Sequence, residues 1–344
     1  MAMIRRISFA AAAAAAAMLG VAGTAHAVGS KSSDGLGEAP IDQQTCGAGS
    51  AGLNGAKDPV GEADWGKAGK VTSGFFYSDK QQERRTDDIV ACLKDGQVLL
   101  YQNESDGNFS KVHKLAEPGS EGRWKDAVSI TAGNFTGSGS NDLFVRWRGG
   151  AASLFKNVST GHKLKEEIQI APPAGEEGVW HNNVVSITSG KFHKDGGLDD
   201  LVVLWTDGEV TRYGLTAAGF GEQGQLRAPD KKWRATRTVA AGHLDGTGDK
   251  SMSDLMVRWS DGRVSVYDYS VEKGLHSESF IRPAGDHEWE GGLMAIGNYH
   301  QAEGKPTNLR DDLLLRWPNG GLSLFQDTSS KGLGREVKLS KPRP

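Results

Sequence analysis

A six-residue stretch that begins with aspartate and continues with apolar residues recurs five times along the chain. Four of the five copies end in tryptophan, and consecutive copies begin 54 to 58 residues apart. A fixed period of this length indicates a repeat architecture in which each repeat is one supersecondary unit. The copies are Asp88–Leu93, Asp142–Trp147, Asp200–Trp205, Asp254–Trp259 and Asp312–Trp317.

A second regular pattern precedes each copy. A tryptophan comes first, a glycine follows it eight to ten residues later, and polar and apolar residues alternate between them. Alternation of this kind predicts a strand, as in Val128–Ala132. The tryptophans of this first slot are Trp65, Trp124, Trp180, Trp233 and Trp289, and the glycines are Gly74, Gly133, Gly190, Gly242 and Gly297.

A turn signal follows each stretch two residues later. It reads Asp-Gly, Asn-Gly or Gly-Gly, and a tyrosine or phenylalanine comes five residues after its last glycine. Such pairs predict a two-residue hairpin turn, because these residue types tolerate the positive φ angles that the turn requires. A less regular fourth strand then leads to a proline. Each unit is therefore expected to hold four strands in about 55 residues.

Four strands alone expose too much apolar surface, so neighbouring units must stack. Five such sheets around an axis form an all-β, five-bladed β-propeller of four-stranded blades. The expected blades run approximately over residues 60–118, 119–173, 174–229, 230–283 and 284–344. Because the four strands of each blade follow one another in sequence, the last blade is expected to close against the first without exchanging a strand.

The N-terminus carries a targeting signal. Met1–Ala27 has a basic start at Arg5 and Arg6, an alanine-rich apolar core, and small residues at Ala25–Ala27 where cleavage would occur. These features predict a secretory signal peptide, and the apolar core is too short for a stable membrane span. The mature protein is therefore expected to be secreted and extracellular.

Residues 28–59 form a predicted tail. Large apolar residues are few there, so the segment cannot bury enough surface to fold alone. It is either a disordered spacer or an extended segment that lies in a groove of another protein. The residues that would make the second contact are Leu36, Glu38, Pro40, Ile41 and Asp42.

The charge balance excludes two classes of partner. The chain has 40 basic and 43 acidic residues with the two signs interspersed, which indicates neither a nucleic-acid surface nor a membrane-binding face.

Cys46 and Cys92 are the two cysteines, and export favours a disulfide between them. The alternatives are two free thiols or an intermolecular bridge. A bond would hold the tail against the first blade, at a position expected to have an accessible edge.

The repeated pattern Gly-x-Phe, followed by Asp-Leu-x-Val-Arg-Trp-x-Asp-Gly, resembles the FG-GAP/VCBS-type repeats of secreted bacterial proteins over roughly residues 60–344. The resemblance implies a propeller, and propellers of this family serve as lectins, enzyme appendages and assembly modules. The family often carries a calcium loop between its first two strands. Here the best remnants are Asp195, Asp199 and Asp200 in the third repeat and Asp245, Asp249 and Asp254 in the fourth. Calcium takes six to eight oxygen ligands, and these degenerate loops offer too few carboxylates. We therefore predict no metal and no cofactor.

A lone exported propeller with an extended tail also resembles, by its layout, the bridging subunit of the umbrella toxin particles of filamentous bacteria. That resemblance implies that the tail lies in the cleft of one partner protein while the propeller body contacts another. Residues Ser30–Gln44 would carry the first contact.

Two sets of side chains are candidates for a binding face of the propeller. A ring of first-slot tryptophans would stack sugar rings or form a protein-binding patch; alternatively, the indoles pack between blades. Arginines beside the second tryptophan would form a broken ring of cations, or else pack their stems on the indole. The candidates are Trp65, Trp124, Trp180, Trp233, Trp289, Arg146, Arg258 and Arg316.

No nucleophile motif, His-x-x-x-His pair or cysteine cluster appears in the sequence. The sequence therefore favours a non-catalytic secreted adaptor that bridges two different partner proteins through its tail and a propeller face. One alternative is a lectin with glycan sites near the tryptophan ring. Another is a secreted propeller hydrolase, whose carboxylates around the axis would leave no short motif.

Overall fold

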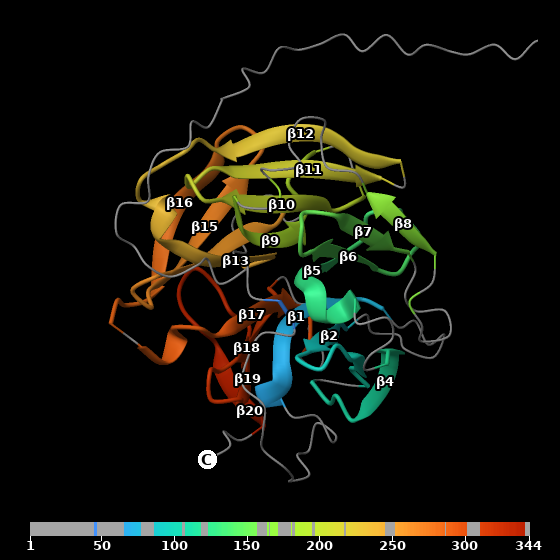
Figure 1. Cartoon of the computed structure of the whole chain (residues 1–344). Coiled ribbons are helices and arrows are strands. Elements are labelled where there is room, and N and C mark those ends of the chain that lie inside the picture. The colour runs from blue at the N-terminus through green and yellow to red at the C-terminus, as the bar shows by residue number, and fades with distance from the viewer. Residues whose placement is uncertain are drawn as a thin grey trace, which may run out of the picture. The chain divides into compact units, whose positions relative to one another are not determined.

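The computed structural model describes residues 45–46, 65–76, 86–104, 107–117, 123–156, 164, 166–170, 180, 183–194, 197–216, 218–244, 252–285, 287–300 and 310–340. All of them belong to one compact unit, residues 39–344. Five antiparallel four-stranded sheets surround a common axis in this unit (Figure 1). The predicted fold class, a five-bladed β-propeller, is confirmed.

The sheets are blades 1 to 5, and each consists of four consecutive strands. Blade 1 contains β1 (Ala68–Gly74), β2 (Asp88–Leu93), β3 (Val98–Gln102) and β4 (Lys111–Ala116). Blade 2 contains β5 (Ala127–Gly133), β6 (Asp142–Trp147), β7 (Ala152–Phe155) and β8 (Glu167–Ile170). Blade 3 contains β9 (Val184–Gly190), β10 (Asp200–Trp205), β11 (Val210–Thr216) and β12 (Gly219–Arg227). Blade 4 contains β13 (Thr236–Gly242), β14 (Asp254–Trp259), β15 (Val264–Ser270) and β16 (Gly274–Arg282), and blade 5 contains β17 (Leu293–Gly297), β18 (Asp312–Arg316), β19 (Leu322–Gln326) and β20 (Arg335–Ser340).

The aspartate that opens each second strand is buried and organises its blade. In blade 5, Asp312 Oδ2 accepts hydrogen bonds from the backbone N–H groups of Tyr299 and His300, at 3.0 and 2.8 Å. Asp312 Oδ1 accepts another from Asp327 N at 2.8 Å. Tyr299 and His300 follow the first strand and Asp327 follows the third, so one carboxylate satisfies backbone groups at both connections. This role explains why the repeated stretch begins with aspartate.

The turn between the second and third strands differs from the prediction. In blade 1, Leu93 N donates to Gln97 O at 2.8 Å and Gly96 N donates to Leu93 O at 2.9 Å, so three residues connect the strands. Gly96 has a φ of 87°, whereas Asp95 is not among the residues with positive φ. Asp95 Oδ1 accepts a bond from Gln97 N at 2.9 Å, which stabilises a type I turn followed by a glycine bulge. The predicted two-residue turn is therefore wrong here.

The first strand of every blade lines the axis. Strands β1, β5, β9, β13 and β17 form a closed ring in which each contacts its two neighbours (Figure 1). These strands belong to separate sheets, and side-chain hydroxyls connect them in place of a backbone ladder. Thr72 Oγ1 on β1 accepts a bond from Ala132 N on β5 at 3.0 Å, and Ser73 Oγ on β1 donates to Ile296 O on β17. Blade 5 thus closes directly on blade 1, as predicted.

Candidate functional site

The first-slot tryptophans lie in the interior of the propeller. Four of them lie on 3-10 turns, η2 (Trp65–Lys67), η3 (Arg123–Asp126), η4 (Trp233–Ala235) and η5 (His287–Trp289). Each belongs to an apolar cluster drawn from two neighbouring blades, and the five clusters correspond to the five blade junctions. Of the two alternatives for these indoles, the structure shows packing between blades, because all five are buried. The relative exposures are 2% for Trp65, 8% for Trp124, 0% for Trp180, 1% for Trp233 and 1% for Trp289.

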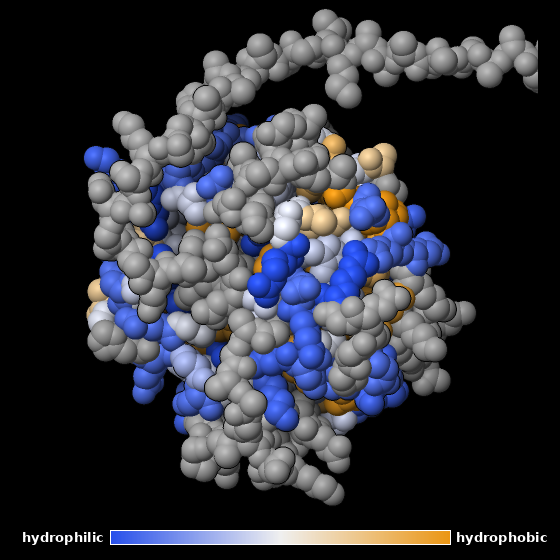
Figure 2. All heavy atoms as spheres, in the orientation of Figure 1, coloured by the Kyte–Doolittle hydropathy of each residue, from blue (hydrophilic) through white to orange (hydrophobic). Residues whose placement is uncertain are grey.

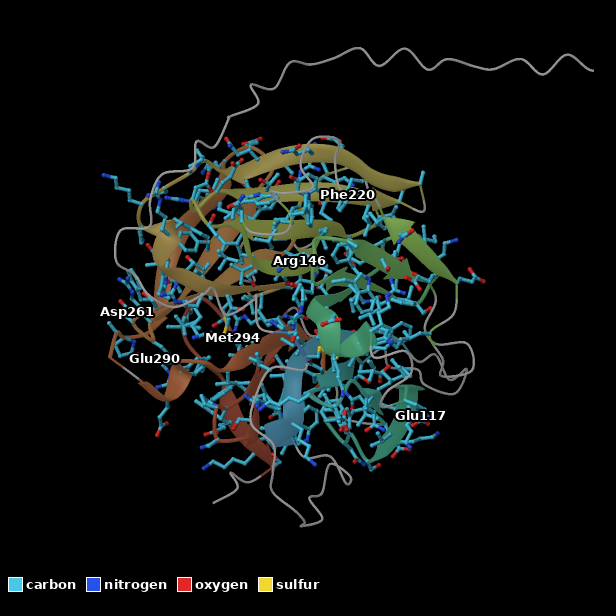
Figure 3. The ribbon with its side chains drawn as sticks, viewed as in Figure 1. Glu117, Arg146, Phe220, Asp261, Glu290 and Met294 are labelled. Carbon is cyan, nitrogen blue, oxygen red and sulfur yellow. A yellow bond between two sulfur atoms is a disulfide. The ribbon has the colours of Figure 1, made fainter. Side chains whose placement is uncertain are left out.

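The arginines beside the second tryptophan are also buried, with exposures of 2% for Arg146, 1% for Arg258 and 7% for Arg316. Arg146 Nη1 donates to Trp180 O at 3.1 Å, which ties blade 2 to blade 3. Arg316 Nε donates to Trp65 O at 3.0 Å, which ties blade 5 to blade 1. Figure 3 shows Arg146 among the ribbons, whereas Glu117 and Asp261 lie at the periphery. The alternative of an exposed ring of cations is therefore wrong, since these side chains are buried and two of them bond across a junction.

Cys92 occupies the arginine slot of blade 1 and forms a disulfide with Cys46, as predicted. Cys46 lies at the junction of blades 1 and 2, where its N–H donates to Ala127 O at 2.7 Å. Arg148 Nη2 donates to Thr45 Oγ1 at 3.2 Å on the same side. A side chain at Gly69 would place its Cβ 2.8 Å from Cys46 O, so a glycine is needed where this segment crosses β1. We call Thr45 and Cys46 the anchor segment.

Both sulfurs of the disulfide are buried, since Cys46 and Cys92 each have 0% exposure. The expectation of an accessible edge at Cys92 is therefore wrong, because the anchor segment itself fills the junction. The candidate tail residues lie outside the described residues: Leu36, Glu38, Pro40, Ile41 and Asp42.

Polar side chains converge at one end of the propeller axis. They are the residues that directly precede the second strands, and they line a cavity of about 150 Å³. Several bond to the loop of a neighbouring blade: Asp87 Oδ2 accepts from Asn298 N at 2.8 Å and Asp311 Oδ2 accepts from His243 N at 2.7 Å. Sequence reasoning missed this set, although one polar residue at the same position of every repeat was a usable signal. The set is Asp87, Asn141, Asp199, Ser253 and Asp311.

Burial and mutual repulsion disfavour ionisation of these carboxyl groups. Burial, together with the charge of Asp311, raises the pKa of Asp87 to about 8. Burial also raises the pKa values of Asp199 and Asp311. Because like charges close together cannot all ionise cheaply, part of the set carries protons at neutral pH.

Replacing Asp87 with asparagine is expected to flatten the pH dependence of stability. The aspartate has a pKa of 3.8 when unfolded and about 8 when folded, so its contribution to folding is complete below about pH 4 and is lost as the pH rises through about 8. Asparagine keeps an acceptor for Asn298 N–H but carries no charge. We expect its melting temperature at pH 8 to exceed that of the wild type by ~2–4 °C, measured by thermal unfolding from pH 5 to 9. Asp95→Asn in the exposed turn is the control, and an Asp87→Asn curve parallel to the wild type would contradict the assignment.

Three carboxylates in one axial cavity are also what a propeller hydrolase would need. However, Asp87, Asp199 and Asp311 each accept a backbone N–H from a neighbouring blade, at 2.7 to 2.8 Å. These contacts assign the carboxylates to joining blades.

Other chemistry on the described residues is sparse. Among them, no group of three or more histidine, cysteine, aspartate or glutamate side chains is placed to hold a metal ion. Within the same residues, none of the helices has the length and apolarity to cross a membrane. Hydrophilic side chains predominate among the coloured residues of the face in Figure 2. Phe280 on β16 is the largest exposed hydrophobic side chain described, at 57% exposure.

No protein-family model matches the chain, and no curated protein is similar to it in sequence. Several solved structures are similar in fold. The BP39L lectin from Burkholderia pseudomallei is 16% identical with a TM-score of 0.45, over 79% of this chain and 70% of that one. A BBS1N structure in complex with ARL6DN is 13% identical with a TM-score of 0.38, over 85% and 87% of the two chains. The Dos1 propeller is 12% identical with a TM-score of 0.29, over 77% and 59%.

Proposed function

We propose that this chain is a non-catalytic, secreted adaptor that joins two partner proteins, one through its N-terminal segment and one through the propeller. The observation that carries the proposal is the covalent attachment of the anchor segment to the propeller. The Cys46–Cys92 disulfide and the bond from Cys46 N to Ala127 O attach the segment to a defined junction of the propeller. This attachment fixes the point on the propeller from which the preceding segment would reach a partner.

The composition of the segment supports the same proposal. Residues 28–44 are polar, with Leu36 and Ile41 as the large apolar side chains, so they have little with which to form a core of their own. An extended segment gains affinity by lying in a groove of a partner, where its backbone and a few side chains are recognised. The rigid propeller supplies a second surface, because its blades are cross-linked by buried hydrogen bonds.

The leader sequence and the disulfide agree with export, since disulfides form and persist outside the cytosol. Within this proposal, the more specific assignment is the bridging subunit of an umbrella toxin particle. It rests on the layout of leader, tail and single propeller.

Carbohydrate binding is a second candidate, and Phe280 is the observation that favours it. The guanidinium of Arg263 lies 5.5 Å and the ammonium of Lys232 5.9 Å from the centre of this exposed ring. An exposed aromatic side chain beside charged hydrogen-bond donors suits a sugar ring better than the buried indoles do.

Deletion of Val28–Gln44 tests the adaptor proposal, because it leaves Thr45 and Cys46 in place. We expect the truncated protein to melt within about 1–2 °C of the wild type, since surface changes away from the core have small effects. It should lose one partner and keep the other in pull-downs from the culture medium of the producing cells, identified by mass spectrometry.

A variant that carries the same 17 residues in scrambled order is the control, because it keeps the length and composition of the segment. It should lose the same partner as the deletion. Recovery of every wild-type partner by the deletion variant would refute the adaptor proposal.

A further inference from the structure

Two cavities lie along the propeller axis, one lined by carboxyl groups and the other by cationic side chains. The polar cavity described above lies where the first strands end. A ring of apolar side chains separates the polar cavity from a second cavity of about 50 Å³. Each blade contributes one of them, three residues before the glycine that ends its first strand. Figure 3 labels one member of this apolar ring on β17. The ring consists of Val71, Ile130, Ile187, Val239 and Met294.

Positive charge lines the second cavity. Lys70 on β1, Arg237 on β13 and Arg258 on β14 contribute cations to its wall. The hydroxyl-bearing residues Ser129 and Ser186 line it as well. Lys70 and Arg258 are buried, whereas Arg237 is half-buried.

Arg258 differs from the other arginines of its slot. Its Nη2 atom is buried and has no hydrogen-bond partner among the described residues, and neither has its Nε, a feature that Arg258 shares with Arg227, Arg263 and Arg282. Arg146 and Arg316, in contrast, donate to the carbonyl of the next first-slot tryptophan. The equivalent carbonyl, that of Trp289, accepts a bond from Gly292 N at 3.4 Å.

The sequence explains the difference. Trp289 precedes its glycine by eight residues, whereas the other first-slot tryptophans precede theirs by nine or ten. In blade 5, β17 also pairs with β18 without the register shift that occurs at the start of β1, β5 and β13. A buried guanidinium with unused N–H groups is costly, because it has lost its hydration without gaining a partner.

The charges around Arg258 leave the cavity positive. Burial, followed by the charge of Arg237, lowers the pKa of Arg258 to about 10, so the guanidinium is protonated at neutral pH. The charge of Glu290 acts in the opposite direction. Glu290 is exposed and lies near the periphery of the view in Figure 3.

We propose that this cavity binds a small oxyanion, a carboxylate or an inorganic phosphate, with Arg258 as its principal ligand. Arg237 and Lys70 supply further positive charge. A guanidinium presents parallel N–H donors that match two oxygens of such an anion. At about 50 Å³, the cavity is larger than the roughly 10–15 Å³ that one water requires.

Thermal unfolding in sodium phosphate, sodium acetate and sodium chloride at equal ionic strength tests the proposal. We expect phosphate or acetate to raise the melting temperature of the wild type above its value in chloride, in a saturable manner. The anion that does so identifies the source as a phosphate or a carboxylate. Arg258→Gln should weaken the apparent affinity at least about tenfold, because a charge-assisted bond is lost.

Arg146→Gln is the matched control, because it removes an arginine from the same slot at a different junction. It should keep the wild-type response to the anion. If Arg258→Gln fails to fold, Arg237→Gln at a half-buried position is expected to fold and to weaken binding by roughly threefold or more. Equal melting temperatures of the wild type in all three salts, or equal responses of the wild type and the variants at the cavity, would overturn the proposal.

Discussion

Replacement of Trp180 by alanine is expected to lower the free energy of unfolding by about 3–5 kcal/mol, the usual cost of removing a large buried aromatic side chain. The indole is fully buried. It packs against Trp205, Tyr213 and Phe220, with ring centroids 5.7, 5.8 and 4.9 Å away. The cavity left at the junction of blades 2 and 3 cannot collapse, because both blades are held by their own sheets. Thermal or denaturant unfolding should show a decrease in melting temperature of roughly 10 °C.

Phe280→Ala is the matched control for this variant, since it removes an aromatic ring from an exposed position. Its stability should stay within about 0.5 kcal/mol of the wild type. The pair also separates packing from binding. If carbohydrate is bound at the exposed ring, Phe280→Ala should abolish the signal on a glycan array while the protein remains folded. A stable Trp180→Ala variant that loses ligand binding would contradict a packing role for Trp180.

Removal of the disulfide by the double substitution Cys46→Ala and Cys92→Ala should cost about 4 kcal/mol. The bond closes a loop with a sequence separation of 46 residues, and its loss restores that loop's freedom to the unfolded chain. The folded state also loses contacts, because both sulfurs lie in the core between blades 1 and 2. The melting temperature should fall by roughly 10 °C.

Treatment of the wild type with a reductant during unfolding should reproduce the melting temperature of the double variant, since both treatments remove the same covalent constraint. A double variant that melts together with the oxidised wild type would show that the disulfide contributes nothing to stability. Limited proteolysis gives an independent measurement. Cleavage near Thr45 should be faster in the double variant, because the anchor segment then depends on its hydrogen bonds alone.

Local patterns in the sequence were sufficient to predict the blades. The second strands β2, β6, β10 and β14 have the bounds of the repeated stretch, and β18 ends one residue before it. Their prediction succeeded because an apolar run between an aspartate and a turn glycine has few other conformations in a repeat protein. The turn itself was mispredicted, because an aspartate side chain that bonds two residues ahead favours a type I turn over the two-residue turn.

The candidate site was harder to predict. The disulfide partners followed from cysteine count and export, and the structure confirms them. The tryptophans and arginines were correctly recognised as equivalent positions, but the sequence left open whether they face solvent. Their burial depends on the neighbouring blade, and no pattern within one repeat describes that contact.

Patterns along the chain are enough to predict the repeating unit and its number: a four-stranded sheet, repeated five times, with a cysteine where three other blades have arginine. Residues close in the chain decide these features through alternation, turns and spacing. The tertiary structure alone decided which polar groups find partners. Arg146 and Arg258 occupy equivalent positions, yet Arg146 bonds to the adjoining blade while two nitrogens of Arg258 lack a partner among the described residues. The partner atom belongs to another repeat, and the spacing from tryptophan to glycine there is ten residues in blade 3, which Arg146 faces, and eight in blade 5, which Arg258 faces.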